Sequence, residues 1–429
     1  MRRLTLVCCI SFAAIAQTPD VQVGVKLTLD EARERALRNS PNIEVARLQA
    51  AAAAQGPLQA RSALSPLLSA SLTGAGASND SRLGAGALNN PVIYSRLGTG
   101  ISVSQLLWDF GRTNKLIATG EMRSEAADTA IQATRSSALL GVTQAYYAGL
   151  RADALIRVAS QTLEARRVVL DQVKALAEAS IKSGLDVSFA EVNVAEAELL
   201  LQKARNDRQA AAAQLAAWMG EEQTRSYVLV ENAEPAGELG NPADLISEAM
   251  RRRPELIARR QQAQADRLFA QAEDRLRWPS LSIVGSAGYM PFHVGAIQQS
   301  GYAAAGLNIG LPLLNGGAFR ARQAEADFRA KATSQQVRQL EIEIKRDVNV
   351  AFLNASMASE RVGLAQKLAD QSSKAFDLAK ARYELGLSSI VEVSQAQLGN
   401  TEAEIQAVNA RYELELQRVV LEYLTGRLQ

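Results

Sequence analysis

The side chains that most often carry chemistry are scarce in this chain. Its 429 residues include one histidine, His293, and two cysteines, Cys8 and Cys9. Histidine serves in acid–base and metal chemistry, and a cysteine thiolate is a nucleophile or a metal ligand. His293, within YMPFHVGAIQQS, separates two segments that we expect to be strands, so we expect it in a surface loop without partner side chains. We therefore expect no catalytic residue, no cofactor-binding residue and no metal site, and a protein that is not an enzyme.

Both cysteines lie in a predicted secretory signal peptide, residues 1–16. Arg2 and Arg3 supply its positive start, residues 4–15 supply a short apolar run, and the small residues of AIA, 14–16, fit a cleavage site. The mature protein then begins near Gln17 and has no thiol. This arrangement predicts an exported protein without disulfides.

Composition narrows the class of protein further. Aromatic residues make up 5% of the chain, the formal net charge is +2, and acidic and basic residues are interspersed. This pattern is typical of solvated helix faces and gives no sign of nucleic-acid binding. After the signal peptide no window approaches 18 uninterrupted apolar residues, so a transmembrane helix is not expected. An exported soluble protein or a protein that enters a membrane as a β-barrel remains.

The sequence contains an internal repeat. SPNIEVARLQAAAA at Pro41 matches RPELIARRQQAQAD at Pro254, and LSPLLSASLTGAG at Pro66 matches RWPSLSIVGSAGY at Pro279, with one offset, 254 − 41 = 279 − 66 = 213. The later matches QLLWDFGR to LPLLNGGA and WMG to LTG share the offset 317 − 111 = 426 − 220 = 206. We predict two structural repeats, residues 17–226 and 227–429, each with a helix, two strands and a long helical hairpin.

Proline is absent where the long helices are expected. None of the 11 prolines lies between Val92 and Glu234 or after Pro312. Residues 112–181 could form a rod of about 105 Å at about 1.5 Å per residue. In the second rod apolar residues from Val337 to Tyr383 recur about every 3.5 residues, the spacing of a coiled-coil seam, and many are alanines. A second apolar set, Leu353, Met357, Leu364 and Leu368, lies off that seam and would allow contact with another neighbour.

Four short segments alternate small apolar with small polar residues: PLLSASLTGAG, GISVSQLLW, PSLSIVGSAGY and YAAAGLNIGLPLL. Windows of about 10 residues with this alternation are typical of transmembrane β-strands. Four strands cannot close a barrel, and open edges are not stable in lipid. The chain must therefore oligomerise, or the strands must pair in water. Three chains would supply 12 strands.

The duplicated layout, QLLWDFGR and PLLNGG at the strand-to-helix turns, and ARYELGLSSIVEVSQAQ together resemble the TolC-type outer-membrane efflux proteins. The resemblance covers essentially the whole mature chain. It implies an α+β membrane protein of the outer membrane that extends into the periplasm. It also implies a homotrimer, with long antiparallel helical hairpins in an α-barrel that continues a 12-stranded transmembrane β-barrel. Such a duct passively exports substrates delivered by an inner-membrane pump through a periplasmic adaptor, in efflux or type I secretion.

In that family, glycines of this motif mark the turns at the periplasmic tips of the hairpins. The resemblance therefore places Gly184 and Gly386 at the tips, where glycine can take a positive φ at a helix C-cap. It implies exposed contacts with the adaptor at these tips, formed by Gly184, Leu185, Val187, Gly386, Leu387, Ser388 and Ile390. Gly111 to Gly184 is 184 − 111 = 73 positions, but Gly317 to Gly386 is 386 − 317 = 69, which predicts two inequivalent tips.

The resemblance also implies a pore gate at Tyr383, Glu392 and Gln395. The family's pattern places acids six residues after each tip glycine and three residues beyond the second, and a ring of acids in one pore favours cations. This chain keeps Glu392 and Tyr383 but has Gln395 at the next position, and Ala190 beside Glu191 in the first copy. Ser388 stands where the family's latch has an arginine, so a single ring of Glu392 is expected.

Two alternatives remain open. A soluble periplasmic coiled-coil scaffold would account for the heptad spacing but not for the alternating segments. A periplasmic adaptor would need a compact β-rich domain, and no such domain is evident in the sequence.

Overall fold

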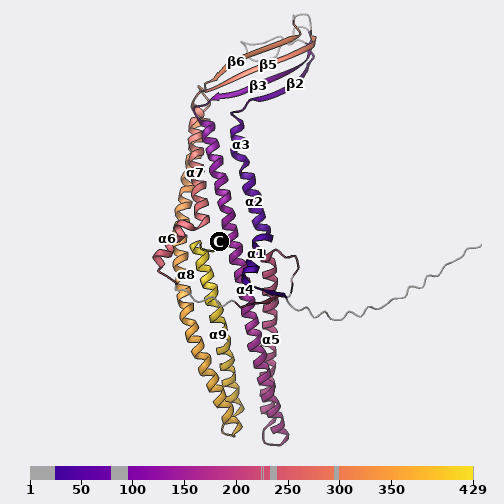
Figure 1. Cartoon of the computed structure of the whole chain (residues 1–429), viewed down its shortest axis with the longest axis vertical. Helices are drawn as coiled ribbons and strands as arrows, with labels where there is room; N and C mark the ends of the chain where they lie inside the picture. Colours follow the sequence, from indigo (N-terminus) through magenta and orange to yellow (C-terminus); the bar gives the residue numbers. More distant parts are fainter. Residues whose placement is uncertain are drawn as a thin grey trace, which may run out of the picture.

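The computed structural model describes residues 25–78, 95–223, 225, 227–231, 239–293 and 299–428, and the predicted signal peptide lies outside these ranges. The chain is an elongated stack of helices with a four-stranded sheet at one end and two helical hairpins at the other (Figure 1). A small sheet and short helices surround the middle of the stack. Among the described residues, none of the helices carries an apolar stretch long enough to cross a lipid bilayer.

Two long helices run the length of the stack. The helices α4 (Arg112–Glu178) and α8 (Ala318–Glu384) each have 67 residues, which corresponds to about 100 Å at about 1.5 Å per residue. Each turns back into a helix of 36 residues, α5 (Gly184–Met219) or α9 (Ile390–Thr425). The rods expected from the absence of proline are thus confirmed.

Shorter helices line the upper half of the stack. They are α1 (Leu29–Asn39), α2 (Pro41–Ala53), α3 (Gln55–Ser62), α6 (Pro242–Arg252), α7 (Pro254–Asp274) and the 3-10 turn η1 (Arg275–Arg277). Three of them begin with a proline, which lacks the N–H that a first helical residue leaves unpaired anyway. The helices α2, α3 and α7 pack on α4, and α7 also packs on α8, so the upper half is several helices thick.

The sheet has the order β2 (Leu67–Ala75), β3 (Arg96–Trp108), β5 (Ser280–His293) and β6 (Gly301–Gly310), and all pairings are antiparallel. The four strands predicted from alternation are confirmed. The expectation for His293 was wrong, because its backbone pairs with Arg96 and it ends β5 instead of lying in a loop. Within the described sheet, β2 and β6 are edges without a partner strand.

The two faces of the sheet differ in chemistry. The register places exposed apolar side chains on one face, including Leu68, Leu72, Ile101, Leu307 and Ile309. The other face carries mostly serine and glycine, and the hydroxyls of Ser69 and Ser102 lie 2.7 Å apart. A sheet with one continuous exposed apolar face needs an apolar surrounding on that side.

The middle of the molecule holds a second, two-stranded sheet that the sequence reasoning missed. The strand β1 (Val25–Leu27) pairs in parallel with β4 (Tyr227–Leu229). The buried hydroxyl of Tyr146 on α4 lies 2.8 Å from the carbonyl oxygen of Leu27 and accepts the N–H of Val230 at 3.0 Å. Each strand has only three residues, too few for an alternating pattern to be recognised.

The predicted alanine-rich seam of α8 is buried within the chain. Its buried members include Ile344, Val348, Ala351, Ala355, Ala358 and Ala365. Alanine side chains allow two helix backbones to approach closely. The second apolar set on α8 is exposed instead, and Leu364 has 66% of its surface accessible.

Candidate functional site at the hairpin ends

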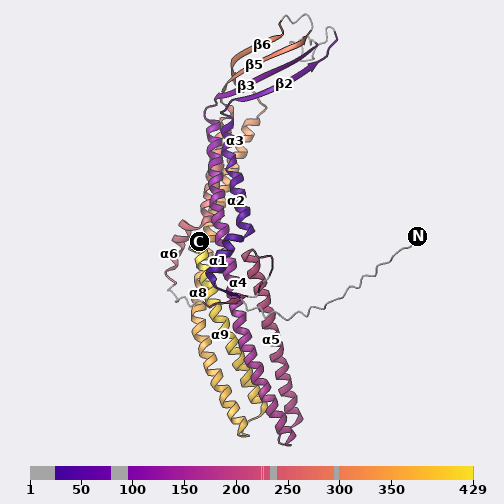
Figure 2. The same cartoon turned by 45° about the vertical axis from the view of Figure 1, so that its right-hand side comes forward.

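The ends of the two hairpins lie side by side at the end of the molecule farthest from the four-stranded sheet (Figures 1 and 2). Residues 179–183 connect α4 to α5, and residues 385–389 connect α8 to α9. The boundaries are related by one offset, since 384 − 178 = 390 − 184 = 206. The two connections therefore have the same length.

The second turn has the geometry expected of a glycine cap. Gly386 takes φ 72°, and the N–H of Leu387 donates to the carbonyl of Arg382 at 2.8 Å. This bond satisfies one of the carbonyls that a helix end leaves free. The prediction of a positive φ at Gly386 is confirmed.

The first turn differs from the expectation. The left-handed residue is Ser180, with φ 59°, and Gly184 is the first residue of α5 with no positive φ. The expectation of Gly184 as a C-cap is therefore wrong, and so is the predicted inequivalence of the two tips. Gly184 corresponds to Ile390, and Ser180 corresponds to Gly386, because 386 − 180 = 206. The prediction for the first tip failed because a serine occupies a backbone conformation that usually favours glycine.

Serine caps start both descending helices. The Ser183 hydroxyl accepts the N–H of Asp186 at 3.3 Å, and the Asp186 carboxylate accepts the N–H of Ser183 at 2.9 Å. In the second hairpin the Ser389 hydroxyl accepts the N–H of Glu392 at 3.3 Å. Hydrogen bonds from the Ser183 backbone and side chain hold the pKa of Asp186 below its usual range.

Asp186 is the counterpart of Glu392, since 392 − 186 = 206, and sequence reasoning missed it. The alignment on Gly184 pointed to Ala190 instead, which is buried. The Ser-x-x-Asp pattern of a capping box at residues 183–186 could have found the acid. Each tip therefore carries one carboxylate at the third position of its second helix.

An apolar cluster joins the two hairpins just above the turns. Its buried members are Val173, Tyr383, Ile390 and Val393, with Val187 partly buried beside them. Ile390 is only 3% exposed, so the expectation that it forms an exposed contact is wrong: it packs against the neighbouring hairpin. The cluster fixes the distance between the two tips.

Tyr383 occupies the centre of this cluster. Its hydroxyl is buried and has no hydrogen-bond partner among the described residues. The Lys182 ammonium, from the other hairpin's turn, lies 4.4 Å from the centre of the Tyr383 ring. Burial, with a further contribution from the charge of Asp186, raises the pKa of the Tyr383 phenol.

Of the remaining predicted contact residues, four are exposed and Ser388 is half-buried. Leu185 and Leu387 are each 66% exposed at the turns, and Gly184 and Gly386 are exposed beside them. Ser388 is half-buried, and its hydroxyl has no partner among the described residues. Each turn therefore presents one of the predicted leucines to solvent.

The three predicted gate residues do not form one group in the chain. Glu392 and Gln395 are three residues apart, so they lie on one exposed face of α9, whereas Tyr383 is buried. The Glu392 carboxylate lies 3.7 Å from the Arg382 guanidinium, a solvent-exposed contact. Glu191 pairs with Lys174 at 3.2 Å within its own hairpin. Glu392 and Gln395 are thus exposed on α9, as Glu191 is on α5, whereas Tyr383 is not accessible.

Polar contacts hold the hairpins together above the cluster. The Asn193 side-chain amide donates to the Ser394 hydroxyl at 2.8 Å, and the hydroxyls of Thr162 and Thr401 lie 3.5 Å apart. In the described part of the chain, no three His, Cys, Asp or Glu side chains gather as a metal site would require. The site's chemistry is thus that of an interface: exposed leucines, one carboxylate per tip and a polar seam.

Known proteins share this sequence and architecture. The model of the family described as outer membrane efflux protein matches residues 32–221 and 245–427. Outer membrane protein TolC of Salmonella enteritidis is 26% identical over 194 residues, which are 43% of this chain and 39% of that protein. The aligned part thus spans less than half of that TolC's length.

Outer membrane protein OprJ of Pseudomonas aeruginosa is 25% identical over 371 residues, 83% of this chain and 75% of that protein. The CmeC outer membrane channel of Campylobacter jejuni, at 16% identity, shares the fold with a TM-score of 0.81 over 99% of this chain and 94% of that one.

Proposed function

The chain belongs to the outer membrane efflux protein family and is an outer-membrane protein, and we propose that it is the exit duct of a tripartite efflux or type I secretion system. Its relatives are channel proteins, not enzymes. The duct is passive: an inner-membrane pump supplies the energy, and a periplasmic adaptor connects the pump to the hairpin tips.

One observation carries this proposal: a four-stranded sheet with an exposed apolar face and two free edges stands on helices about 100 Å long. Backbone groups on a free edge cannot stay unpaired in lipid. Pairing β2 of one copy with β6 of the next removes every edge when three copies close a ring of 12 strands. Strands of 9–14 residues are long enough to cross a bilayer when tilted.

The helices offer a matching interface for a homotrimer. Exposed apolar residues follow one face of α8, namely Val350, Leu353, Met357, Leu364 and Leu368, and another set follows α5, namely Leu185, Phe189, Val192 and Leu199. Because α4 already packs against α9 in the same chain, these outer faces of α5 and α8 remain for neighbouring copies. Three pairs of hairpins then form an α-barrel of 12 helices below the β-barrel.

Cross-linking of two residues at a similar distance from the hairpin tips tests this interface. Leu199 on α5 and Leu368 on α8 each stand about four helical turns above the hairpin tip. Both cysteines of the chain fall in the predicted signal peptide, so engineered thiols would stand alone. The double variant Leu199→Cys/Leu368→Cys, oxidised in outer membranes, should give covalent trimers, whereas each single variant should not. A water-soluble dimer would instead support the alternative of a soluble periplasmic coiled-coil scaffold.

The two repeats, 17–226 and 227–429, are the product of a duplication in this proposal. The constant offset of 206 between the helix boundaries of the two hairpins supports it. So does the offset of the preceding helices, since 242 − 29 = 254 − 41 = 213.

In the trimer, the tips form both the adaptor surface and the gate. Exposed Leu185 and Leu387 contact the adaptor together with the backbone at Gly184, Gly386 and Ser388. Glu392 from each copy contributes to a ring that favours cations, with Gln395 one turn farther along α9. Replacing Leu387 with Asp should abolish export while trimers persist. Unchanged export by this variant would contradict the adaptor assignment.

A further inference from the structure

A groove runs along α4 in the middle of the molecule, with α5 and α9 on its two sides. We name it the α4 groove. Its volume is about 460 Å³, and its lining residues on α5 extend from Leu200 to Gln214, which is about 21 Å at about 1.5 Å per residue. A groove that is long for its volume is narrow. It therefore fits an elongated small molecule better than a round one.

The α4 groove opens on the side of α4 that faces away from α1 and the small sheet. On the opposite side, the Thr143 hydroxyl accepts a hydrogen bond from Arg33 of α1, and Tyr146 contacts β1. Leu155, which lines the groove, follows Tyr146 by nine residues, or two and a half turns, and so points the other way. A duct needs an open lumen, so elements that thicken its wall must lie outside. In the proposed trimer the groove therefore faces the lumen.

The lining of the groove is apolar with an excess of positive charge. Most of its members are alanine, leucine or isoleucine, and the polar members are Arg151, Lys203, Asp207, Gln214 and Asn409. Among the described residues, the side chains of Arg151 and Lys203 have neither an ion pair nor a hydrogen bond. On the far side of α5, by contrast, Arg208 pairs with Asp153 at 2.7 Å. Two cations against one carboxylate leave the groove ready for an anion.

Trp218 stands at the end of the groove that is nearer the four-stranded sheet. It follows Gln214 by about one turn of α5. Its ring lies on Gly141 of α4, where a Cβ would come within 2.4–2.6 Å of three ring atoms, so this packing requires a glycine. The ring still has 36% of its surface accessible. It offers a flat apolar surface to a molecule that lies along the groove.

The second half of the chain lacks these cations. Arg151 corresponds to Met357 and Lys203 corresponds to Asn409, since 357 − 151 = 409 − 203 = 206. The two hairpins nevertheless have helices of the same lengths. The hairpin architecture therefore does not depend on a cation at either position, and the two charges are free to serve a ligand.

We propose that the α4 groove is a transit site in the lumen for an elongated organic anion with an apolar body. This inference rests on the proposed function and names a class of cargo for it. Arg151 binds the carboxylate or sulfonate group, and Lys203 supplies a second positive charge on the side of the hairpin tips. The apolar body lies along the alanines toward Trp218, as is usual for a pocket with an apolar wall and a few polar groups.

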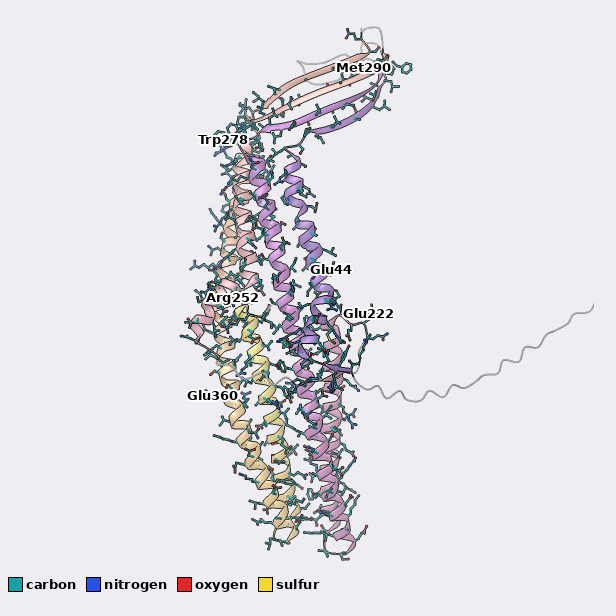
Figure 3. All side chains as sticks on the ribbon, viewed as in Figure 1. Glu44, Glu222, Arg252, Trp278, Met290 and Glu360 are labelled. Atoms are coloured by element: carbon teal, nitrogen blue, oxygen red, sulfur yellow. The ribbon has the colours of Figure 1, made fainter. Side chains whose placement is uncertain are left out.

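Trp218 reports on the groove once the other two tryptophans of the chain are replaced. Trp108→Phe/Trp278→Phe removes those near the sheet, where Figure 3 shows Trp278. Titration of this protein with 8-bromooctanoate, whose terminal bromine quenches tryptophan, should give saturable quenching. The cation of the same length, 8-bromooctyltrimethylammonium, should bind at least about tenfold more weakly, since a charge-assisted hydrogen bond contributes that much. Quenching that does not saturate, or that is equal for both probes, would mean partition into detergent and would overturn the proposal.

Substitutions of the charged residues locate the bound anion. Arg151→Gln should weaken binding of 8-bromooctanoate at least about tenfold, and Arg151→Lys should retain most of it. Asp207→Asn should strengthen binding, because it removes the acid from the lining. The matched control is Arg205→Gln. Arg205 is exposed and lies two positions from both Lys203 and Asp207, so it points away from the groove. Equal losses in Arg151→Gln and Arg205→Gln would show a general attraction to basic surface and would overturn the proposal.

Conductance tests whether the site lies in the lumen. In a planar bilayer, 8-bromooctanoate should reduce the conductance of the wild type, and Arg151→Gln should need at least about tenfold more of it for the same reduction. Saturable binding without any effect on conductance would place the groove outside the lumen. That result would overturn the transit site and leave the duct intact. Failure of Leu199→Cys/Leu368→Cys to form covalent trimers is the separate result that would contradict the duct.

Discussion

The guanidinium of Arg35 lies 3.4 Å from the carboxylate of Glu221, and the same two places in the second half of the chain hold the opposite charges. These places are Glu248 and Arg427, since 248 − 35 = 213 and 427 − 221 = 206, and the Arg427 Nε lies 3.0 Å from the Glu248 carboxylate. Each pair ties a short helix, α1 or α6, to the residue that follows the hairpin's αL glycine, Gly220 or Gly426. Either partner of the pair can be the acidic one, provided that the other is basic.

This exchange predicts a rescue by double substitution. Glu248→Arg should lower the melting temperature in detergent because it places a guanidinium group beside those of Arg427 and Arg252. Glu248→Arg/Arg427→Glu should recover the part of the loss that comes from Arg427, with a coupling energy of about 1 kcal/mol for neighbouring charges. The control is the same pair of measurements for Arg35→Glu and Arg35→Glu/Glu221→Arg. Additive losses in both double variants would show that the contacts are incidental.

The Glu248 pair also predicts a pH dependence. Hydrogen bonds from Arg427 hold the pKa of Glu248 below its ordinary value, so the folded protein favours the carboxylate. A depressed pKa contributes stability above the unfolded value, about 4.3, and that stability is lost as the pH falls through the lower folded value. The melting temperature of the wild type should therefore fall more steeply below about pH 5 than that of Glu248→Gln. Parallel curves for the two proteins would contradict this.

Exchanging glycine for a residue with a side chain at one tip turn, and the reverse at the other, should change stability in opposite directions. Gly386→Ala should destabilise its turn by about 1 kcal/mol, because a Cβ there meets no atom within 4 Å and only the φ of 72° opposes it. Ser180→Gly should leave its turn equally or more stable, since it relieves the same strain. Hydrogen exchange of the turn amides measures both effects locally. Faster exchange in Ser180→Gly than in the wild type would show that the Ser180 hydroxyl supports the turn.

A substitution at Tyr383 tests the apolar cluster that joins the two hairpins. Its hydroxyl is buried with no partner among the described residues, so Tyr383→Phe removes an unsatisfied group and should be neutral or stabilising by up to about 1 kcal/mol. The conductance of the protein reconstituted in a planar bilayer should stay at the wild-type level. A rise in conductance would mean that the hydroxyl closes the tip through a partner in another copy.

In the proposed trimer, Glu392 should contribute to ion selectivity. Glu392→Gln should reduce cation preference, measured as the reversal potential across a planar bilayer with a salt gradient, because it removes one carboxylate from each copy. Its exposed contact with Arg382 contributes little, so stability should not change. Glu360→Gln, an exposed acid far from the tips on α8, should leave selectivity unchanged (Figure 3). Equal effects of the two variants would refute the gate position.

Long-range regularity made most of the fold predictable. The proline-free stretches gave the two rods, and small apolar and polar residues in alternation gave the four strands, because both patterns repeat over many residues. The three-residue strands β1 and β4 escaped prediction, since their pairing depends on contacts around Tyr146 instead of on a local pattern.

The candidate site was less predictable, because single residues departed from their usual preferences. Ser180 takes a conformation typical of glycine while Gly184 begins a helix, which shifted the alignment of the first tip by one helical turn. Ile390 was expected on the surface because it follows an exposed turn, but the neighbouring hairpin covers it. That contact joins opposite halves of the chain, so no local pattern reveals it.

Each hairpin has one arm of 67 residues and one arm of 36 residues. This equality limits which insertions and deletions the protein can accept. An insertion in one arm moves its tip out of the common plane and rotates its apolar seam away from its neighbour. Only gains or losses close to a whole heptad preserve the seam, and each must occur in both arms of both hairpins. A change in the length of the hairpins that keeps both the seam and the level of the tips therefore requires four coordinated changes in the gene.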